Sequence, residues 1–216
     1  MEDINIKEII KIIKKEYKKL KTPFVTVDAE KTKEPFRVLI STIISLRTKD
    51  STTAEASNRL FKLASTPSDM LKLKIPQIEK ALYPAGFYRV KAKTIKQVCR
   101  ELVNNYDSRV PDDLDELLKL KGVGRKTANL VITLGYNKPG ICVDTHVHRI
   151  FNRLGYIKTK TPHESEMALR EKLPGRYWID INSLLVAYGQ NICKPVGPRC
   201  DICKIENYCG KVGVKK

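Results

Sequence analysis

The chain has 216 residues, 42% of them hydrophobic, which is enough to bury the core of one large domain or two small ones. Forty-one lysines and arginines against 24 acidic residues give a formal net charge of +17. This excess predicts a polyanionic partner such as nucleic acid, although a lysine-rich solvated surface would give the same count. No stretch approaches the roughly 20 apolar residues of a membrane span. We therefore expect a cytoplasmic, nucleoid-associated protein without membrane contact, in a compartment where disulfides are rare.

Helical periodicity runs through almost the whole chain and predicts an all-α fold. One apolar stripe extends from Ile6 to Leu20 with lysines opposite, and a second, from Phe36 to Ile44, is nearly continuous and therefore buried. Only a few residues near Phe24–Val27 alternate with a period of two. Further helices are expected near 51–64, 67–73, 76–83, 89–105, 112–120, 125–134, 145–154, 163–172 and 179–189, separated by proline or glycine.

The stretch LKGVGRKTANLV, residues 120–131, places a tight basic turn between two apolar helices. Gly122 and Gly124 permit a compact turn and let a ligand approach backbone N–H groups, and the following helix N-terminus adds donors that suit a phosphate. The turn is not a nucleotide P-loop, because glycine does not immediately precede the lysine and no strand precedes the turn. Taken alone, it fits both contact with a nucleic-acid backbone and an ordinary helix–helix turn.

Four cysteines near the end of the chain, Cys193, Cys200, Cys203 and Cys209, are separated by six, two and five residues. Disulfides do not fit the expected compartment. Zinc sites usually contain two C-x-x-C pairs, whereas this stretch contains one. The spacing therefore favours an iron–sulfur cluster, with zinc as the alternative. Cys99 lies on an apolar helical face and is expected in the core.

The stretch LKGVGRKTANLV, followed by VDTHVHR, resembles the helix-hairpin-helix and catalytic region of the endonuclease III family of DNA glycosylases. The cysteine spacing resembles the cluster loop of that family, and the resemblance extends upstream through LISTIISLRTKD and GFYRVKAKTI to nearly the whole chain. It implies a two-lobed all-α fold in which a helical domain, 28–138, carries the hairpin. Residues 1–27 and 139–216 would pack around a [4Fe-4S] cluster held by the four cysteines.

The resemblance also implies a bifunctional DNA glycosylase and AP lyase of base excision repair that excises oxidised pyrimidines. In the family, the lysine after GVGR attacks the sugar, and the aspartate of V-D-T-H assists it. The matching residues in this chain are Lys126 and Asp144. Asp144 would accept a proton or stabilise positive charge at C1′, and β-elimination from the Schiff base would cut the strand. The alternatives are a phosphate contact for Lys126 and an N-cap of helix 145–154 for Asp144.

Two positions match residues that act when the damaged base leaves the stack. Arg47 stands where bacterial members usually carry a gap-filling glutamine, and because arginine only donates hydrogen bonds, the preferred opposite base stays open. Phe87 matches a wedge that is leucine in some members, with a core aromatic as the alternative. By the same matching His146 lines the base pocket or contacts DNA. Asp50 resembles a pocket-supporting aspartate or caps helix 51–64.

The partner implied is double-stranded DNA with a damaged base or abasic site, lying between Lys126 and Asp144 and bound by a monomer. Lys121 departs from the family, which usually has proline there. Lys194 and Arg199 of the cluster loop would touch phosphates or remain solvated. The other expected DNA contacts are the turn residues Gly122, Val123, Gly124, Arg125 and Thr127.

Three other functions compete with this one. A mismatch glycosylase acting on G·T or G·U pairs is the nearest, but such relatives typically lack a lysine at the position of Lys126. A non-catalytic DNA-binding module would use the hairpin and the cluster as scaffold. A redox protein would leave the charge and the hairpin unexplained.

Overall fold

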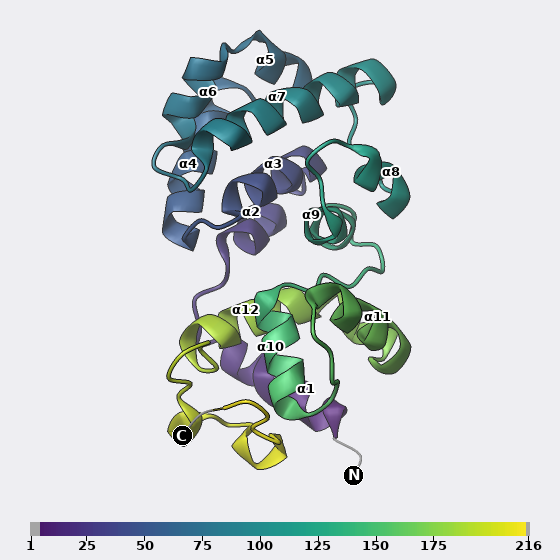
Figure 1. Cartoon of the computed structure of the whole chain (residues 1–216). Helices are drawn as coiled ribbons and strands as arrows, with labels where there is room; N and C mark the ends of the chain where they lie inside the picture. The colour runs from purple at the N-terminus through teal and green to yellow at the C-terminus, as the bar shows by residue number, and fades with distance from the viewer. Residues whose placement is uncertain (1–4, 215–216) are drawn as a thin grey trace. The chain divides into compact units, whose positions relative to one another are not determined.

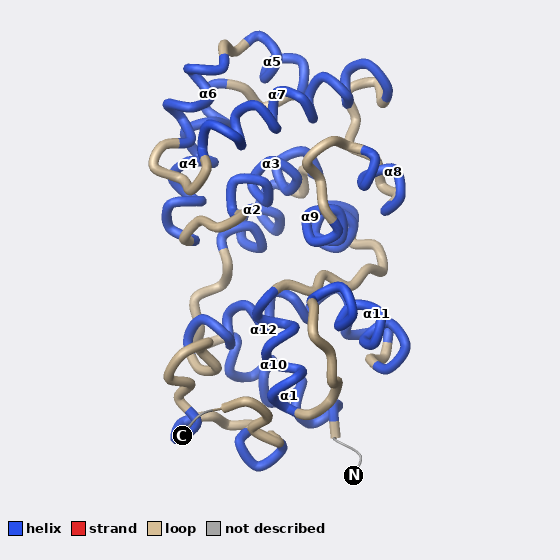
Figure 2. Tube along the Cα trace, viewed as in Figure 1, coloured by secondary structure: helices blue, strands red, loops and turns tan. Residues whose placement is uncertain are grey.

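The computed structural model describes residues 5–214, and every regular element in that range is helical, as the periodicity predicts (Figure 1, Figure 2). Within it, no helix is long and apolar enough to cross a membrane. The chain divides into two compact units, Phe24–Gly140 and the pair of segments Met1–Pro23 and Ile141–Lys216.

The unit Phe24–Gly140 is built around one buried helix, α3. Eight of its eleven residues are buried, among them Leu39, Ile40 and Ile44, and burying each such side chain contributes about 1.5–3 kcal/mol. The helices of this unit are α2 (Phe24–Thr32), α3 (Pro35–Ser45), α4 (Asp50–Leu63), α5 (Pro67–Lys72), α6 (Ile75–Leu82), α7 (Tyr88–Asn105), α8 (Leu114–Lys119), α9 (Arg125–Leu130) and the π-helix η1 (Val131–Gly135). The expected burial of the apolar stripe from Phe36 to Ile44 is confirmed.

The other unit joins the N-terminal helix to the last third of the chain. Helix α12 contacts both α1 and α10, and Ile9, Ile13, Val147, Phe151 and Tyr188 form part of their shared core. The elements are α1 (Ile6–Tyr17), α10 (Thr145–Leu154), α11 (Pro162–Lys172), η2 (Gly175–Tyr177), α12 (Trp178–Asn191), η3 (Cys200–Ile202) and η4 (Glu206–Tyr208). Up to residue 214, the cysteine-bearing segment after α12 has only the short 3-10 helices η3 and η4 as regular structure.

The period-two alternation near Phe24–Val27 does not mark an extended segment. These residues belong to helix α2, because Val25 and Ala29 pack into the core at helical spacing. One local expectation was wrong. Asp50 does not cap the helix that follows it, since it is the first residue of α4 and Lys49 is the N-cap. Its Oδ1 instead accepts a hydrogen bond of 2.9 Å from the N–H of Phe24, at the start of α2.

Candidate functional site

The hairpin turn between α8 and α9 requires glycine at its first position. Gly122 has a φ of 92°, and a Cβ there would lie 2.5 Å from Cγ2 of Thr94. The N–H of Val123 donates 3.0 Å to the carbonyl of Leu120, which closes the turn. Gly124 has open space around its Cα and precedes the first residue of α9. The backbone of Gly124 is therefore accessible to an approaching group.

The apolar residues that flank this basic turn anchor it to the core. Leu117, Leu120, Val123 and Ala128 are buried among the side chains of the unit Phe24–Gly140. Thr127 is also buried, with 2% of its surface exposed. Of the expected turn contacts, Val123 and Thr127 thus offer DNA only backbone groups, since their side chains face inward.

Lys126 lies in the first turn of α9, directly after Arg125, and both side chains are half-buried. The neighbouring Lys121 is exposed, and its N–H donates 2.9 Å to Oε2 of Glu101 on α7. This bond fixes the entry to the turn at the position where the family usually has proline. Lys126 therefore follows a turn whose entry is tied to α7.

Asp144 is the N-cap of α10, as expected from the sequence. Its Oδ1 accepts hydrogen bonds of 2.9 Å from the N–H of His146 and 3.0 Å from that of Val147. The residue is 7% exposed, so two backbone donors hold its carboxylate in one orientation. Asp144 belongs to the unit with the cysteine loop, whereas Lys126 belongs to the unit Phe24–Gly140.

His146 is connected to the cysteine loop through Arg149, a residue that the sequence reasoning missed. Nη2 of Arg149 lies 3.0 Å from Nδ1 of His146 and 2.8 Å from the carbonyl of Cys193. A guanidinium only donates, so Nδ1 of His146 accepts this bond and Nε2 carries the proton of the neutral ring. A Cβ on Gly189 would lie 2.4 Å from Nδ1, so glycine is needed for this approach.

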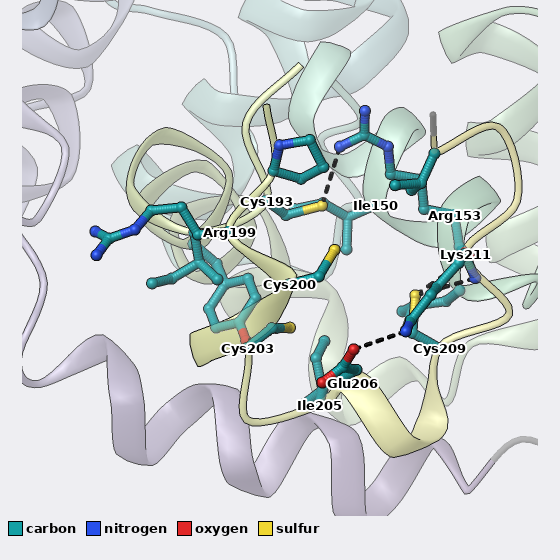
Figure 3. A pocket seen from close by; sticks show the side chains of 15 residues that line it. Ile150, Arg153, Cys193, Arg199, Cys200, Cys203, Ile205, Glu206, Cys209 and Lys211 are labelled. Carbon is teal, nitrogen blue, oxygen red and sulfur yellow. Dashed lines mark hydrogen bonds and ion pairs between the residues drawn. The ribbon is translucent and has the colours of Figure 1, made fainter. Parts of the chain in front are cut away.

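The four cysteines line one pocket, and Figure 3 shows their sulfur atoms around it. Arg153, also missed from the sequence, is buried beside them and donates from Nη1 to Sγ of Cys193 at 3.3 Å. The same guanidinium donates to the carbonyls of Lys194 and Pro195 at 2.6 and 2.9 Å. Arg149 and Arg153 are four residues apart on α10 and therefore share a face, which is the signal that could have identified them.

The thiols of this pocket sit in a protein environment that supplies hydrogen bonds to sulfur. Oη of Tyr188 lies 3.2 Å from Sγ of Cys203, and the N–H of Lys211 donates 3.4 Å to Sγ of Cys209. Burial raises the pKa of both the Cys203 and the Cys209 thiols. Across the described part of the chain, no three histidine, cysteine or acidic side chains are grouped closely enough to hold a single metal ion.

The expected DNA-contacting residues of the loop lie at its surface. Lys194 and Arg199 are exposed, and Figure 3 shows the Arg199 side chain pointing away from the cysteines. Arg47 and Phe87 are exposed as well, at the turns before α4 and α7, and 61% of the Phe87 surface is accessible. This exposure argues against the reading of Phe87 as a core aromatic.

The fold and the hairpin define a class of proteins, and comparisons with known proteins agree with it. Residues 40–175 match the HhH-GPD superfamily of base excision DNA repair proteins. Endonuclease III of Thermotoga maritima is 51% identical over 176 residues, which are 82% of this chain and 83% of that protein. The chain therefore belongs to the endonuclease III family of this superfamily.

Two solved structures are similar over most of the chain. One is a non-covalent endonuclease III–DNA complex, with a TM-score of 0.85 and 31% identity over 95% of this chain and 94% of that one. The other is a trapped endonuclease III–DNA covalent intermediate, an estranged-adenine complex, with a TM-score of 0.78 and 35% identity over 82% of this chain and 84% of that one.

Proposed function

We propose that this protein is a DNA glycosylase and AP lyase of base excision repair, which removes oxidised pyrimidines through an amine nucleophile. The observation that carries the proposal is Lys126, the second residue of the helix that follows the glycine turn. An endonuclease III with a similar structure has been trapped covalently on DNA. The net charge of +17 suits a duplex partner, because basic side chains displace counterions from phosphates.

The proposed reaction begins with the neutral amine of Lys126 attacking C1′ of the damaged nucleotide. The C1′–N bond to the base breaks, and its electron pair leaves with the base, which takes up a proton. The lysine nitrogen, now bonded to C1′, loses a proton. Its lone pair then breaks the C1′–O4′ bond, O4′ is protonated as the sugar ring opens, and a Schiff base results. Removal of a proton from C2′ then breaks the C3′–O bond, so the strand is cut 3′ to the lesion. The reacting centre needs no metal.

We propose Asp144 as the residue that assists Lys126. The two N–H groups that fix its carboxylate keep a negative charge in one place. That charge serves either of two purposes: it accepts the proton released by the amine, or it stabilises cationic character at C1′. His146, attached to the same cap, would contact the flipped base or the DNA beside it.

We propose that Cys193, Cys200, Cys203 and Cys209 hold a [4Fe-4S] cluster. Four cysteines around one pocket fit a group with four thiolate ligands, and a stretch with a single C-x-x-C pair favours an iron–sulfur cluster over zinc. When bound, the cluster would cross-link the loop after α12. Lys194 and Arg199 of this loop would then contact DNA phosphates. We further propose that the protein acts as a monomer on chromosomal DNA in the nucleoid.

The experiment is borohydride trapping on a duplex that carries one thymine glycol. The wild-type protein should give a covalent adduct, and Lys126→Ala should lower its yield by about a thousandfold or more, because no other group supplies the Schiff base. Asp144→Asn keeps a capping oxygen but loses the charge, so it should form adduct slowly while remaining folded. Lys121→Ala, in the same turn, is the matched control and should still form the adduct.

The other outcomes identify the competing functions. Base loss without an adduct would mean a monofunctional glycosylase, and a preference for G·T or G·U duplexes would indicate the mismatch enzyme. Binding without any reaction, on abasic DNA as well, by protein that contains iron and sulfide, would leave a DNA-binding module.

A further inference from the structure

Arg47 and Phe87, the two residues expected to enter the DNA stack, both have left-handed backbones. Their φ angles are 51° and 57°, a conformation that costs a residue with a Cβ about 1–2 kcal/mol. Their side chains meet, with the guanidinium carbon of Arg47 5.6 Å from the centre of the Phe87 ring. Contacts with the rest of the unit must therefore hold two strained turns side by side.

A hydrogen bond to the Thr48 side chain joins these two turns, and their backbones approach closely. The N–H of Gly86 donates 3.1 Å to Oγ1 of Thr48, so the residue after Arg47 binds the residue before Phe87. A Cβ on Gly86 would lie only 2.5 Å from the carbonyl oxygen of Arg47. The two turns are thus in contact through main-chain atoms, and Thr48 is the side chain that links them.

The buried side chain of Lys91 is hydrogen-bonded to the segment that carries Arg47. It lies in the first turn of α7 and is 5% exposed, and its own N–H donates 3.0 Å to the carbonyl of Phe87. Its Nζ donates 2.7 Å to the carbonyl of Ile44, 2.6 Å to that of Leu46 and 2.8 Å to Oγ1 of Thr48. The carbonyls belong to the C-terminal end of α3, where acceptors lack helical partners and a cation is favoured.

These contacts engage all three hydrogens of the Lys91 ammonium, which leaves none for a phosphate. A lysine that neutralises DNA phosphates must lie at the surface, and lysine side chains are rarely fully buried. Here the side chain is directed inward, toward the turn that carries Arg47. Its role is therefore in the architecture of the two turns rather than in the DNA contact itself.

We propose that Lys91 is a positioning residue which, with Thr48, locks the Arg47 and Phe87 turns into one rigid element that enters the duplex when a damaged nucleotide is flipped out. This inference rests on the proposed function, because it assumes that Arg47 and Phe87 fill the vacated stack. Lys91 touches neither base nor sugar. Nucleotide extrusion and discrimination of the opposite base therefore depend on Lys91 and Thr48, whereas the attack by Lys126 does not.

The test compares duplex with single-stranded abasic DNA, since a single strand has no stack to fill and no opposite base. Lys91→Met removes the donors at nearly constant length, and Thr48→Val removes the linking hydroxyl while Thr48→Ser keeps it. Lys96→Met is the matched control, because Lys96 lies on the same helix and its Nζ also donates to two carbonyls, those of Leu71 and Leu73. Borohydride trapping and the fluorescence of 2-aminopurine opposite the lesion are the two readouts.

Lys91→Met and Thr48→Val should slow adduct formation on the duplex by about ten-fold or more, as expected when one positioning contact is lost. They should also abolish most of the 2-aminopurine signal and bring the rates opposite guanine and adenine closer together. Thr48→Ser and Lys96→Met should stay within about threefold of wild type on both substrates. On single-stranded abasic DNA all four variants should form the adduct at the wild-type rate.

Three results would overturn the inference. Wild-type duplex rates and fluorescence in Lys91→Met and Thr48→Val would show that the turns position themselves. An equal loss in Lys96→Met, or an equal loss on single-stranded DNA, would indicate a general effect on stability. If Lys91→Met does not fold, the Thr48→Val and Thr48→Ser pair decides alone. Absence of any adduct with wild-type protein would contradict the proposed function instead.

Discussion

The hairpin turn and the paired turns of Arg47 and Phe87, which we propose to contact DNA, are built in opposite ways. The hairpin relies on a residue type, because Gly122 adopts a φ of 92° without a Cβ to strain it. The paired turns place arginine and phenylalanine in left-handed conformations and depend on hydrogen bonds of Lys91 and Thr48 that join two segments distant from each other in sequence. The conformation of the hairpin is thus determined by residues within the turn itself. The conformation of the paired turns is determined by buried residues that join two segments of the chain, which we call their framework.

This difference decides which substitutions each site tolerates. In the hairpin, the sensitive position is the turn glycine itself. In the paired turns, the exposed side chains can change without breaking the backbone, whereas the buried residues beneath them cannot. The predictions below test this contrast.

The largest effect is expected for Gly86→Ala. The new methyl would lie 2.5 Å from the carbonyl oxygen of Arg47, a backbone atom that moves only with its whole turn. We expect the free energy of unfolding to fall by about 2–3 kcal/mol. Because the turn that carries Arg47 and the turn that carries Phe87 would move apart, single-turnover excision from a duplex should slow by about a hundredfold. Urea unfolding and quenched-flow assays measure the two quantities.

Gly175→Ala is the control for Gly86→Ala, since a Cβ on Gly175 meets nothing within 4 Å. It should leave both stability and excision close to wild type. If Gly86→Ala behaved in the same way, the two turns would be free to shift relative to each other, and the framework would not be rigid.

A smaller effect is expected from the titration of Lys91. Burial lowers the pKa of its ammonium to about 8, from an ordinary value of 10.5. Between these values the unfolded chain binds the proton more often than the folded one, so this group makes the fold more stable as the pH rises. The stability of wild type relative to Lys91→Met should therefore increase by about 2 kcal/mol from near pH 7.5 to near pH 10.

Chemical denaturation of the wild type and of Lys91→Met at several pH values measures this difference in the free energy of unfolding. Contributions from all other titrating groups are common to both proteins and cancel. A difference that stays constant with pH would mean that Lys91 keeps an ordinary pKa. A difference that declines as the pH rises would mean that its hydrogen-bonded cation outweighs the cost of burial.

The hairpin could be predicted from the sequence because its determinants are contiguous. Two glycines, the flanking apolar residues and the N–H donors at the next helix start lie within about a dozen positions, so the turn and the burial of its flanking residues followed from spacing alone. The N-cap role of Asp144 was equally local and is confirmed, since a capping side chain bonds N–H groups two and three residues ahead.

The framework of the paired turns could not be predicted in the same way. Lys91 reads as one more surface lysine on a basic helix, and only the fold brings it to carbonyls more than 40 positions away. The prediction that Asp50 caps the helix after it was wrong for a related reason. Its neighbours in sequence suggested a cap, but its carboxylate accepts a hydrogen bond from the start of α2. Polar side chains that bond distant backbone carry no periodic signal.

The smallest effects separate stability from binding within the hairpin itself. Gly122→Ala would force a left-handed alanine against Thr94, so its free energy of unfolding should fall by about 1–2 kcal/mol. Gly124 has a φ of −97° and open space at its Cα, so Gly124→Ala should leave stability unchanged or raise it by about 0.5 kcal/mol.

Affinity for DNA should not follow this order, because a phosphate that approaches the backbone of Gly124 would meet the new methyl directly. Gly124→Ala should therefore bind an abasic-analogue duplex several-fold more weakly although it is fully stable, as measured by fluorescence anisotropy at fixed salt. Unaltered affinity in Gly124→Ala, together with weak binding in Gly122→Ala, would mean that the turn shapes the hairpin but does not itself receive the phosphate. We therefore propose separable roles for the glycines of one turn: Gly122 permits the conformation, and Gly124 provides the surface for contact.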